Sequence, residues 1–398
     1  MCRIKAILLA VFLTSCVGLV SAQNVIFVNV ANTATNQDGL SWNTAFSSLH
    51  DALSTATPAT EVWVVGGTYT TTTAFVVGND VRVYGGFNGT ETSRDQRDVL
   101  LNVTTLSGDS GSGQRNLHVL YAKDVLDTTL IDGFTVTGGN ALAPSGDLSE
   151  GGGVYLDNAP VTFQNVIFEY NIAGRGGAMS FPQQWPVFKN CTFRHNTATG
   201  SDGGGAIYAF GGTVWVYDSI FENNTAQRGG ALAVYFGGAV VTNSLFRENE
   251  ATVFGGGAIE VRWQGDLWLY NTIIAGNTAT KGIGGGVFFN GYGGRIINSV
   301  LKNNTAGITG GVVGYTGTLT FLNSIAWGNQ ATDTNTGAQM TTFGSGVIQA
   351  GNSIVEDGVP SRVEDLGENI FDEPYFAGSG TNAGGVRVVY GSPGVEAG

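Results

Sequence analysis

The sequence contains few of the residues that hold small exported domains together or bind metals. Only 3 of its 398 residues are cysteine and 3 are histidine. Cys2 and Cys16 lie in an N-terminal segment that we expect to be cleaved, which leaves Cys191 without a disulfide partner in the chain. His118 and His195 have no His, Cys or paired carboxylates at ligand spacing, which disfavours a zinc site or a catalytic triad. Packing must therefore supply the stability.

Charged residues are also scarce, and their balance is negative. They make up 12% of the chain, and the formal net charge is −13. Loss of Arg3 and Lys5 with a cleaved leader would make the mature chain more negative still. This charge argues against nucleic acid or an anionic membrane surface as partner. Beyond the first 22 residues, no segment is long and apolar enough to span a bilayer.

The first 22 residues have the pattern of a secretory signal peptide. Arg3 and Lys5 precede an apolar run over residues 6–20, and small residues follow up to Ala22. Residues 13–16 (Leu-Thr-Ser-Cys) also fit a lipoprotein cleavage box, but residues 17–20 stay apolar where a lipoprotein would become polar. We therefore expect cleavage after Ala22 and a secreted or cell-surface protein, with lipoprotein processing as the alternative.

Glycine is abundant, at 62 residues, and aromatic residues make up 11% of the chain, which indicates a β-rich, closely stacked domain. A repeat accounts for this composition. An Asn or Asp is followed by Asn six residues later and by Ala two residues after that, and successive copies start 25 to 28 residues apart. The copies start at Asn165, Asn190, Asp218, Asn243, Asn271, Asn298 and Asn323. Such a period is typical of a solenoid.

Each repeat predicts the same short strands and turn. Positions two before and three after the start are apolar in every copy, as in Phe163 and Phe168, so we expect two inward columns. The Asn six residues after the start, as in Asn171, predicts a turn with left-handed backbone and a ladder of stacked amides. The fourth residue after each repeat start alternates between acidic and basic over four coils, from Glu169 to Arg247, which predicts ion pairs between neighbouring coils.

These patterns divide the chain into four parts. After the signal peptide (residues 1–22), residues 23–140 read as an N-terminal cap and first coils, 141–337 as regular repeats, and 338–398 as irregular last coils and a C-terminal cap. A short helix is expected to start at Ser41 as N-cap, with Trp42, Phe46, Leu49 and Leu53 on one face. It would cover the open end of the stack.

The repeats resemble known proteins. Phe-x-x-Asn followed by Gly-Gly-Ala, as in residues 168–178, is similar to the repeats of polymorphic outer-membrane autotransporter passengers. The segments 62–69 and 83–92 resemble secreted bacterial right-handed β-helix proteins with a pectin-lyase-like fold. The resemblance implies an all-β, right-handed parallel β-helix of roughly ten coils, used in adhesion. In such relatives a sorting or barrel domain commonly follows, so the mode of attachment stays open.

The resemblance does not define an activity, because this scaffold carries lyases, hydrolases and adhesins alike. The polygalacturonase and pectate lyase signatures are absent from the sequence. The best polar pair is Glu260 with Arg262, which we interpret as an ion pair on a solvated face rather than a catalytic site, with Tyr208 and Tyr235 on preceding coils. An acidic run over residues 356–373 could hold Ca²⁺ but fits a solvated cap better.

Exposed aromatic residues give the stronger functional signal. Trp215 and Tyr217 recur two coils later as Trp268 and Tyr270, at equivalent outward positions roughly 9.6 Å apart, which is two rung spacings. Aromatic faces in register suit stacking against sugar rings. We therefore predict a monomeric binding or adhesive module directed at a polysaccharide or surface glycan, without a cofactor. A polysaccharide lyase or glycoside hydrolase is the alternative.

Overall fold

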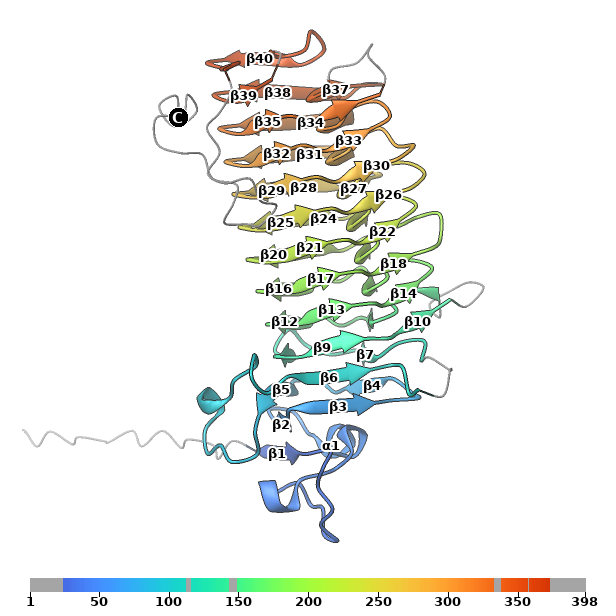
Figure 1. The fold of residues 1–398 in the computed structure, drawn as a ribbon, viewed down its shortest axis with the longest axis vertical. Helices are drawn as coiled ribbons and strands as arrows, with labels where there is room; N and C mark the ends of the chain where they lie inside the picture. Colours follow the sequence, from blue (N-terminus) through green and yellow to red (C-terminus); the bar gives the residue numbers. More distant parts are fainter. Residues whose placement is uncertain (1–23, 112–115, 143–148, 333–337, 357, 373–398) are drawn as a thin grey trace, which may run out of the picture.

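The chain winds into an elongated stack of coils with one long axis. The computed structural model describes residues 24–111, 116–142, 149–332, 338–356 and 358–372. Figure 1 shows helix α1 (Leu49–Thr55) and the first strands at one end of the stack and the last strands at the other. Neighbouring coils pair through parallel strands, with Phe163 opposite Phe188, for example.

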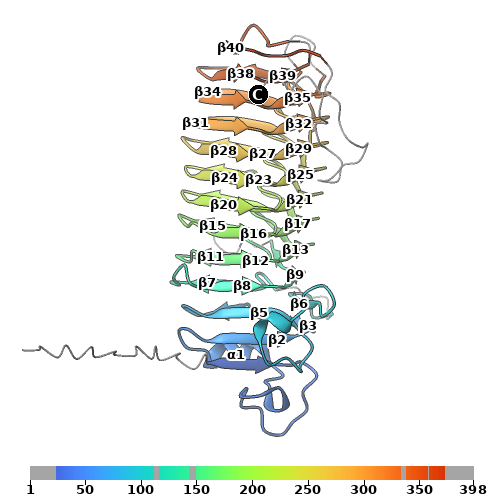
Figure 2. The same ribbon diagram turned by 90° about the vertical axis from the view of Figure 1, so that its left-hand side faces the viewer.

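Each regular coil passes through three sheets. A 21-stranded sheet supplies two strand positions per coil, which we call the first column and the second column, and Figure 2 shows them side by side. The chain then enters an eleven-stranded sheet and a narrow eight-stranded sheet before it returns to the first column. The columns merge in β31 (Val287–Ile297) and β34 (Val312–Leu322), which run through both.

The strands are short in all three sheets. Those of the first column are β4 (Phe75–Val77), β7 (Leu120–Lys123), β11 (Val154–Asp157), β15 (Met179–Pro182), β19 (Ile207–Phe210), β23 (Leu232–Tyr235), β27 (Ile259–Arg262) and β37 (Met340–Thr342). Those of the second column are β1 (Val25–Val28), β2 (Glu61–Val65), β5 (Arg82–Phe87), β8 (Leu130–Asp132), β12 (Thr162–Gln164), β16 (Val187–Lys189), β20 (Thr213–Tyr217), β24 (Gly238–Thr242), β28 (Asp266–Tyr270), β38 (Val347–Gly351) and β40 (Glu364–Gly367).

The other two sheets complete the coils. The eleven-stranded sheet contains β3 (Gly67–Thr70), β6 (Thr104–Ser107), β9 (Thr135–Thr137), β13 (Ile167–Glu169), β17 (Thr192–Arg194), β21 (Ile220–Glu222), β25 (Leu245–Arg247), β29 (Ile273–Ala275), β32 (Val300–Lys302), β35 (Ile325–Trp327) and β39 (Ile354–Val355). The eight-stranded sheet contains β10 (Asn140–Ala141), β14 (Ile172–Ala173), β18 (Thr197–Ala198), β22 (Thr225–Ala226), β26 (Glu250–Ala251), β30 (Thr278–Ala279), β33 (Thr305–Ala306) and β36 (Gln330–Ala331). In the described residues, eight consecutive coils have a strand in every sheet, slightly fewer than the roughly ten expected.

The interior is filled by the two apolar columns that the repeat predicts. Phe163 and its equivalents form one column and Phe168 and its equivalents form the other, and both are buried throughout. From Phe168 to Phe246 the rings stack face to face with centroids 4.5–4.7 Å apart. This distance matches the spacing of neighbouring strands, so backbone pairing and ring stacking support one another. Cys191 is also buried in this core and is unpaired.

The predicted amide ladder is present. From Asn171 to Asn329, each Nδ2 donates to the Oδ1 of the ladder Asn in the next coil, over 2.9–3.1 Å. The ladder ends at Gln339, which accepts a hydrogen bond from Asn329 and donates one to Glu356. The prediction of left-handed backbone at the ladder residues is wrong, because each ladder N–H must point at the next amide. Left-handed backbone instead falls at the repeat start and directly before the ladder residue, as in Tyr170.

The N-terminal cap differs from the prediction in where its helix begins. Helix α1 starts after Ser48, whose side chain accepts a hydrogen bond from the main chain of Asp51. Ser41 caps a separate 3₁₀ turn, η1 (Trp42–Thr44). A continuous helix cannot form here because main-chain hydrogen bonds join Phe46 to Phe27 in β1 and to Asn29, the residue directly after β1. The buried face of α1, which joins the core, consists of Leu49, Ala52 and Leu53.

The alternating charges four residues after each repeat start form ion pairs, as predicted. Arg194 contacts Glu169 at 2.6 Å, and Arg247 pairs with Glu222 in the same way two coils further on. Strand register places Arg194 opposite Glu222 as well. These residues are therefore part of the scaffold.

Candidate functional site

The four predicted aromatic residues lie at equivalent positions on the second column. Strand register aligns Trp215 with Val240 and Trp268, and Tyr217 with Thr242 and Tyr270. All four side chains are half-buried on the outer face, whereas their neighbours along the strands point into the core. The predicted register of the aromatic pairs is therefore confirmed.

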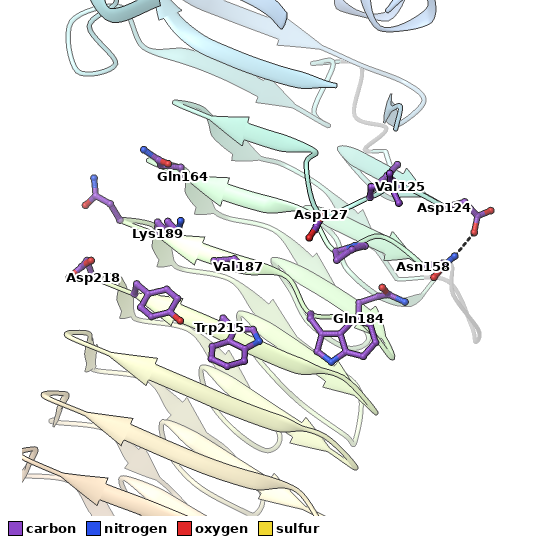
Figure 3. A pocket seen from close by; sticks show the side chains of 15 residues that line it. Asp124, Val125, Asp127, Asn158, Gln164, Gln184, Val187, Lys189, Trp215 and Asp218 are labelled. Atoms are coloured by element: carbon purple, nitrogen blue, oxygen red, sulfur yellow. Dashed lines mark hydrogen bonds between the residues drawn. The ribbon is translucent and has the colours of Figure 1, made fainter. Parts of the chain in front are cut away.

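Trp215 and Tyr217 also line a large open groove on the described part of the molecule. It has a volume of about 960 Å³ and crosses the outer face of three second-column strands, β12, β16 and β20. Figure 3 shows Trp215 and Val187 in the middle of the groove, with Gln164, Lys189 and Asp218 at one side. Because alternate side chains of a strand point to opposite faces, these residues project outward while Phe163, Phe188 and Val216 fill the core.

The opposite side of the groove is built by the connections between the two columns. In three successive coils these connections hold Asp124 to Asp127, Asn158 to Pro160, and Gln184 with Trp185. Asn158 donates a 2.8 Å hydrogen bond to Asp124, which joins two of the connections (Figure 3). Trp185 is 56% exposed and brings a third aromatic ring to the groove. In the next coil the connection shrinks to Gly211 and Gly212, so the wall ends there.

Trp268 and Tyr270 are not part of the groove lining. The Trp268 ring leans back over β24, where a Cβ atom placed on Gly238 would lie 3.4 Å from its Cζ3. The groove therefore lies on the N-terminal side of Trp215 and does not extend to Trp268. A binding role for Trp268 and Tyr270 stays a prediction.

Trp185 was not predicted from the sequence, because it occupies no repeated position. Its signal was the longer, non-repeating connection Gln183 to Pro186 between two regular strands. Loops of irregular length on a regular scaffold are where binding residues concentrate.

The groove carries polar groups of two kinds. The amides of Gln164, Asn158 and Asn190 surround the aromatic rings. Three exposed carboxylates, those of Asp124, Asp127 and Asp218, line the groove together with one ammonium group, that of Lys189. The groove is thus acidic on balance, which disfavours a polyanionic ligand.

Glu260 and Arg262 form the predicted ion pair, but the prediction of a solvated face is wrong. Glu260 is 0% exposed, with its Oε1 in contact with Arg262 and 3.7 Å from Arg228. The ring of Phe254 covers both guanidinium groups, at 4.8 Å from Arg228 and 5.2 Å from Arg262. Tyr208 and Tyr235 on the preceding coils are buried as well.

This burial has an electrostatic consequence and a functional one. Desolvation raises the pKa of the Glu260 carboxyl to about 7, although Arg262 and Arg228 oppose the shift. A substrate could not reach this carboxyl, because Glu260 is fully buried. The cluster therefore acts as a buried part of the scaffold in this conformation.

The remaining candidates have structural contacts. The His118 ring lies 2.8 Å from the carbonyl of Gly151, and the His195 ring stacks on Tyr170 at 5.0 Å. Among the described residues, no three His, Cys, Asp or Glu side chains gather closely enough to hold a metal ion. In the acidic run, Glu364 accepts a hydrogen bond from Gln349, and Glu373 lies outside the described residues. No helix among the described residues is long and apolar enough to cross a membrane.

The fold and groove thus define a parallel β-solenoid with an open, aromatic-lined surface on one sheet. Residues 152–354, just over half of the chain, match the family described as the right-handed β-helix region, and the chain belongs to this family. The predicted fold class is confirmed. Over 130 residues, 32% of this chain, the sequence is 33% identical to metabotropic glutamate receptor-like protein R of Dictyostelium discoideum. The match covers only 8% of that protein's length.

Proposed function

We propose that the protein binds a glycan chain in the groove over β12, β16 and β20, as a monomeric, secreted or cell-surface module for recognition or adhesion. The observation that carries the proposal is the meeting of Trp185, Trp215 and Tyr217 in one open groove together with amide side chains. Sugar rings present apolar C–H faces and hydroxyl edges. Aromatic rings can cover the faces while amides bond the edges, as in other sites with few, well-placed polar groups.

The charge of the groove narrows the ligand class. Asp124, Asp127 and Asp218 outnumber Lys189, so a neutral or amino-sugar glycan fits better than a polyuronate. The similarity to a segment of a receptor-like protein also fits a recognition role better than an enzymatic one.

The test compares two tryptophans of the same column. The mature protein, starting at Gln23, would be screened on a glycan array and then titrated with the best oligosaccharide by calorimetry. Because Trp215 lines the groove, Trp215→Ala should weaken binding by about 1–3 kcal/mol. Trp268→Ala is the matched control, since Trp268 lies in register two coils away but outside the groove lining.

Three outcomes decide the matter. Loss with Trp215→Ala alone, at an unchanged melting temperature, supports the groove. Equal loss with both variants would extend the site to the wider aromatic face that the sequence predicts. Unchanged binding by Trp215→Ala would contradict the proposal.

Glycan hydrolysis is the second candidate, because three carboxylates line the same groove. Glycosidases use two carboxyl groups that flank the scissile bond. Release of new reducing ends from a bound polysaccharide, abolished by Asp127→Asn or Asp218→Asn, would make the protein an enzyme. Binding without product formation would leave it a binding module.

A further inference from the structure

A second row of exposed aromatic residues runs along the stack, at the bend between the two columns. We call it the aromatic ridge, and it consists of Phe210, Phe236, Trp263, Tyr292 and Tyr315, one from each of five successive coils. Figure 2 shows the strands that flank it, with β23 beside β24 and β27 beside β28. Phe236 lies 5.5 Å from Phe210 and 5.2 Å from Trp263 between ring centroids, so these three rings form a continuous strip.

The ridge is held in an unfavourable backbone conformation. Phe236 and Trp263 have φ values of 58° and 54°, in the left-handed region. The corresponding bend in the four preceding coils is made by Asp124, Asn158, Gln183 and Gly211, of which all but Gln183 are residue types that tolerate this region. A bulky side chain there is strained, so the fold alone does not favour an aromatic ring at this bend. The chain thus places large rings where its own fold favours small or polar residues, and leaves those rings 49% and 42% exposed.

A pocket beside the ridge indicates what the rings contact. It has a volume of about 400 Å³ and lies between Phe236, Trp263 and Tyr292. Its polar lining consists of the Gln264 and Asn290 amides, the Thr316 hydroxyl and the main chain of two glycines. The Thr316 hydroxyl donates a 2.7 Å hydrogen bond to Asn290, which fixes the orientation of that amide. None of the described residues that line this pocket carries a charge, in contrast to the groove.

We infer that the aromatic ridge is a second glycan-binding surface, specific for neutral polysaccharides whose sugar rings stack on Trp263, Phe236 and Tyr292. Apolar ring faces would lie on the aromatic strip, and hydroxyl groups would bond Gln264 and Asn290. The absence of charge from the pocket lining favours uncharged sugars over uronates, amino sugars and peptides rich in charge. This inference shares the ligand class of the proposed function but rests on different residues, so each can fail alone.

The experiment is affinity electrophoresis of the mature protein in gels containing hydroxyethylcellulose, mannan or laminarin, with polygalacturonate as the acidic comparison. The test variants are Trp263→Gly, which removes the ring and suits the left-handed backbone, and Tyr292→Ala, whose side chain is 63% exposed. Tyr170→Gly is the matched control. Tyr170 is 54% exposed and left-handed, but it lies at a different corner of the coil.

We expect at least one neutral polysaccharide to retard the wild-type protein. The apparent affinity should be at least fivefold weaker for both test variants and unchanged for Tyr170→Gly. Melting temperatures should change little. Wild-type affinity in both Trp263→Gly and Tyr292→Ala, or retardation by polygalacturonate alone, would overturn the inference. A third contrary result would be a wild-type protein that binds no polysaccharide but self-associates in sedimentation runs, with Trp263→Gly abolishing the self-association. The ridge would then be an interface between copies of the chain. In the same gels, loss with Trp215→Ala alone would support the groove and reject the ridge, whereas loss with the two ridge variants alone would support the ridge.

Discussion

Replacing Asn249 by Ala should destabilise the protein strongly, because Asn249 lies in the middle of the buried amide ladder. Its side chain makes four hydrogen bonds. Its Nδ2 donates to the carbonyl of Phe221 and to Asn277, and its Oδ1 accepts from the main-chain N–H and the Nδ2 of Asn224. Truncation would leave these two donors of Asn224 buried without that acceptor. A buried polar group without a partner costs about 1–3 kcal/mol, so we expect a loss of about 2–6 kcal/mol.

Urea unfolding followed by tryptophan fluorescence would measure the change, with hydrogen exchange to locate it. The control is Asn243→Gly in the same coil. Asn243 belongs to an exposed row of amides and has a φ of 52°, a conformation that glycine adopts without strain. Its replacement should cost less than about 1 kcal/mol.

The loss of stability in Asn249→Ala should be local. Because each coil of a solenoid contacts only its neighbours, faster exchange should be concentrated in the coils of Asn224, Asn249 and Asn277. Equal urea midpoints for Asn249→Ala and Asn243→Gly would show that the ladder does not hold the coils together. Hydrogen exchange that rises uniformly along the stack would show the same.

Two further predictions concern charges. Burial raises the pKa of Glu260 from 4.5 to about 7, so the folded state binds the proton more tightly than the unfolded state. The free energy of unfolding should therefore fall by at most about 3 kcal/mol as pH rises from 4.5 through 7. Melting curves of Glu260→Gln should lack this loss, and an identical pH dependence in both proteins would contradict the assignment. Arg194→Glu would place a carboxylate between Glu169 and Glu222, so we expect destabilisation at low salt, at about 0.2–1 kcal/mol for each pair affected. Adding Glu169→Arg and Glu222→Arg should restore part of the melting temperature, and additive losses would refute the pairing.

The sequence predicted the interior because the interior repeats. The positions of Phe163, Phe168 and Asn171 occur in seven copies of the repeat, so a wrong register would have conflicted with every copy. The outer surface does not repeat in this way. The groove depends on connections of unequal length, such as the one that carries Trp185. The guanidinium groups beside Glu260 are covered by Phe254, which lies in the loop before β27. Neither contact follows from strand periodicity, since both are made by residues that occur in one coil only.

The aromatic pairs were visible in the sequence, but their environments were not. Trp215 and Trp268 occupy the same strand position, yet only Trp215 faces a wall of loops. The aromatic ridge was missed for a related reason. Phe236 and Trp263 lie at a bend where a left-handed conformation would predict Gly or Asn, so periodicity gave no reason to place aromatic rings there.

The most direct test of glycan binding in the groove is a crystal structure of the mature protein with the tightest-binding oligosaccharide. Our account predicts a sugar ring stacked on Trp215, near Tyr217 and Trp185, with hydroxyl groups bonded to Gln164 or Lys189. An empty groove at a saturating ligand concentration, with sugar bound only elsewhere on the solenoid, would contradict it.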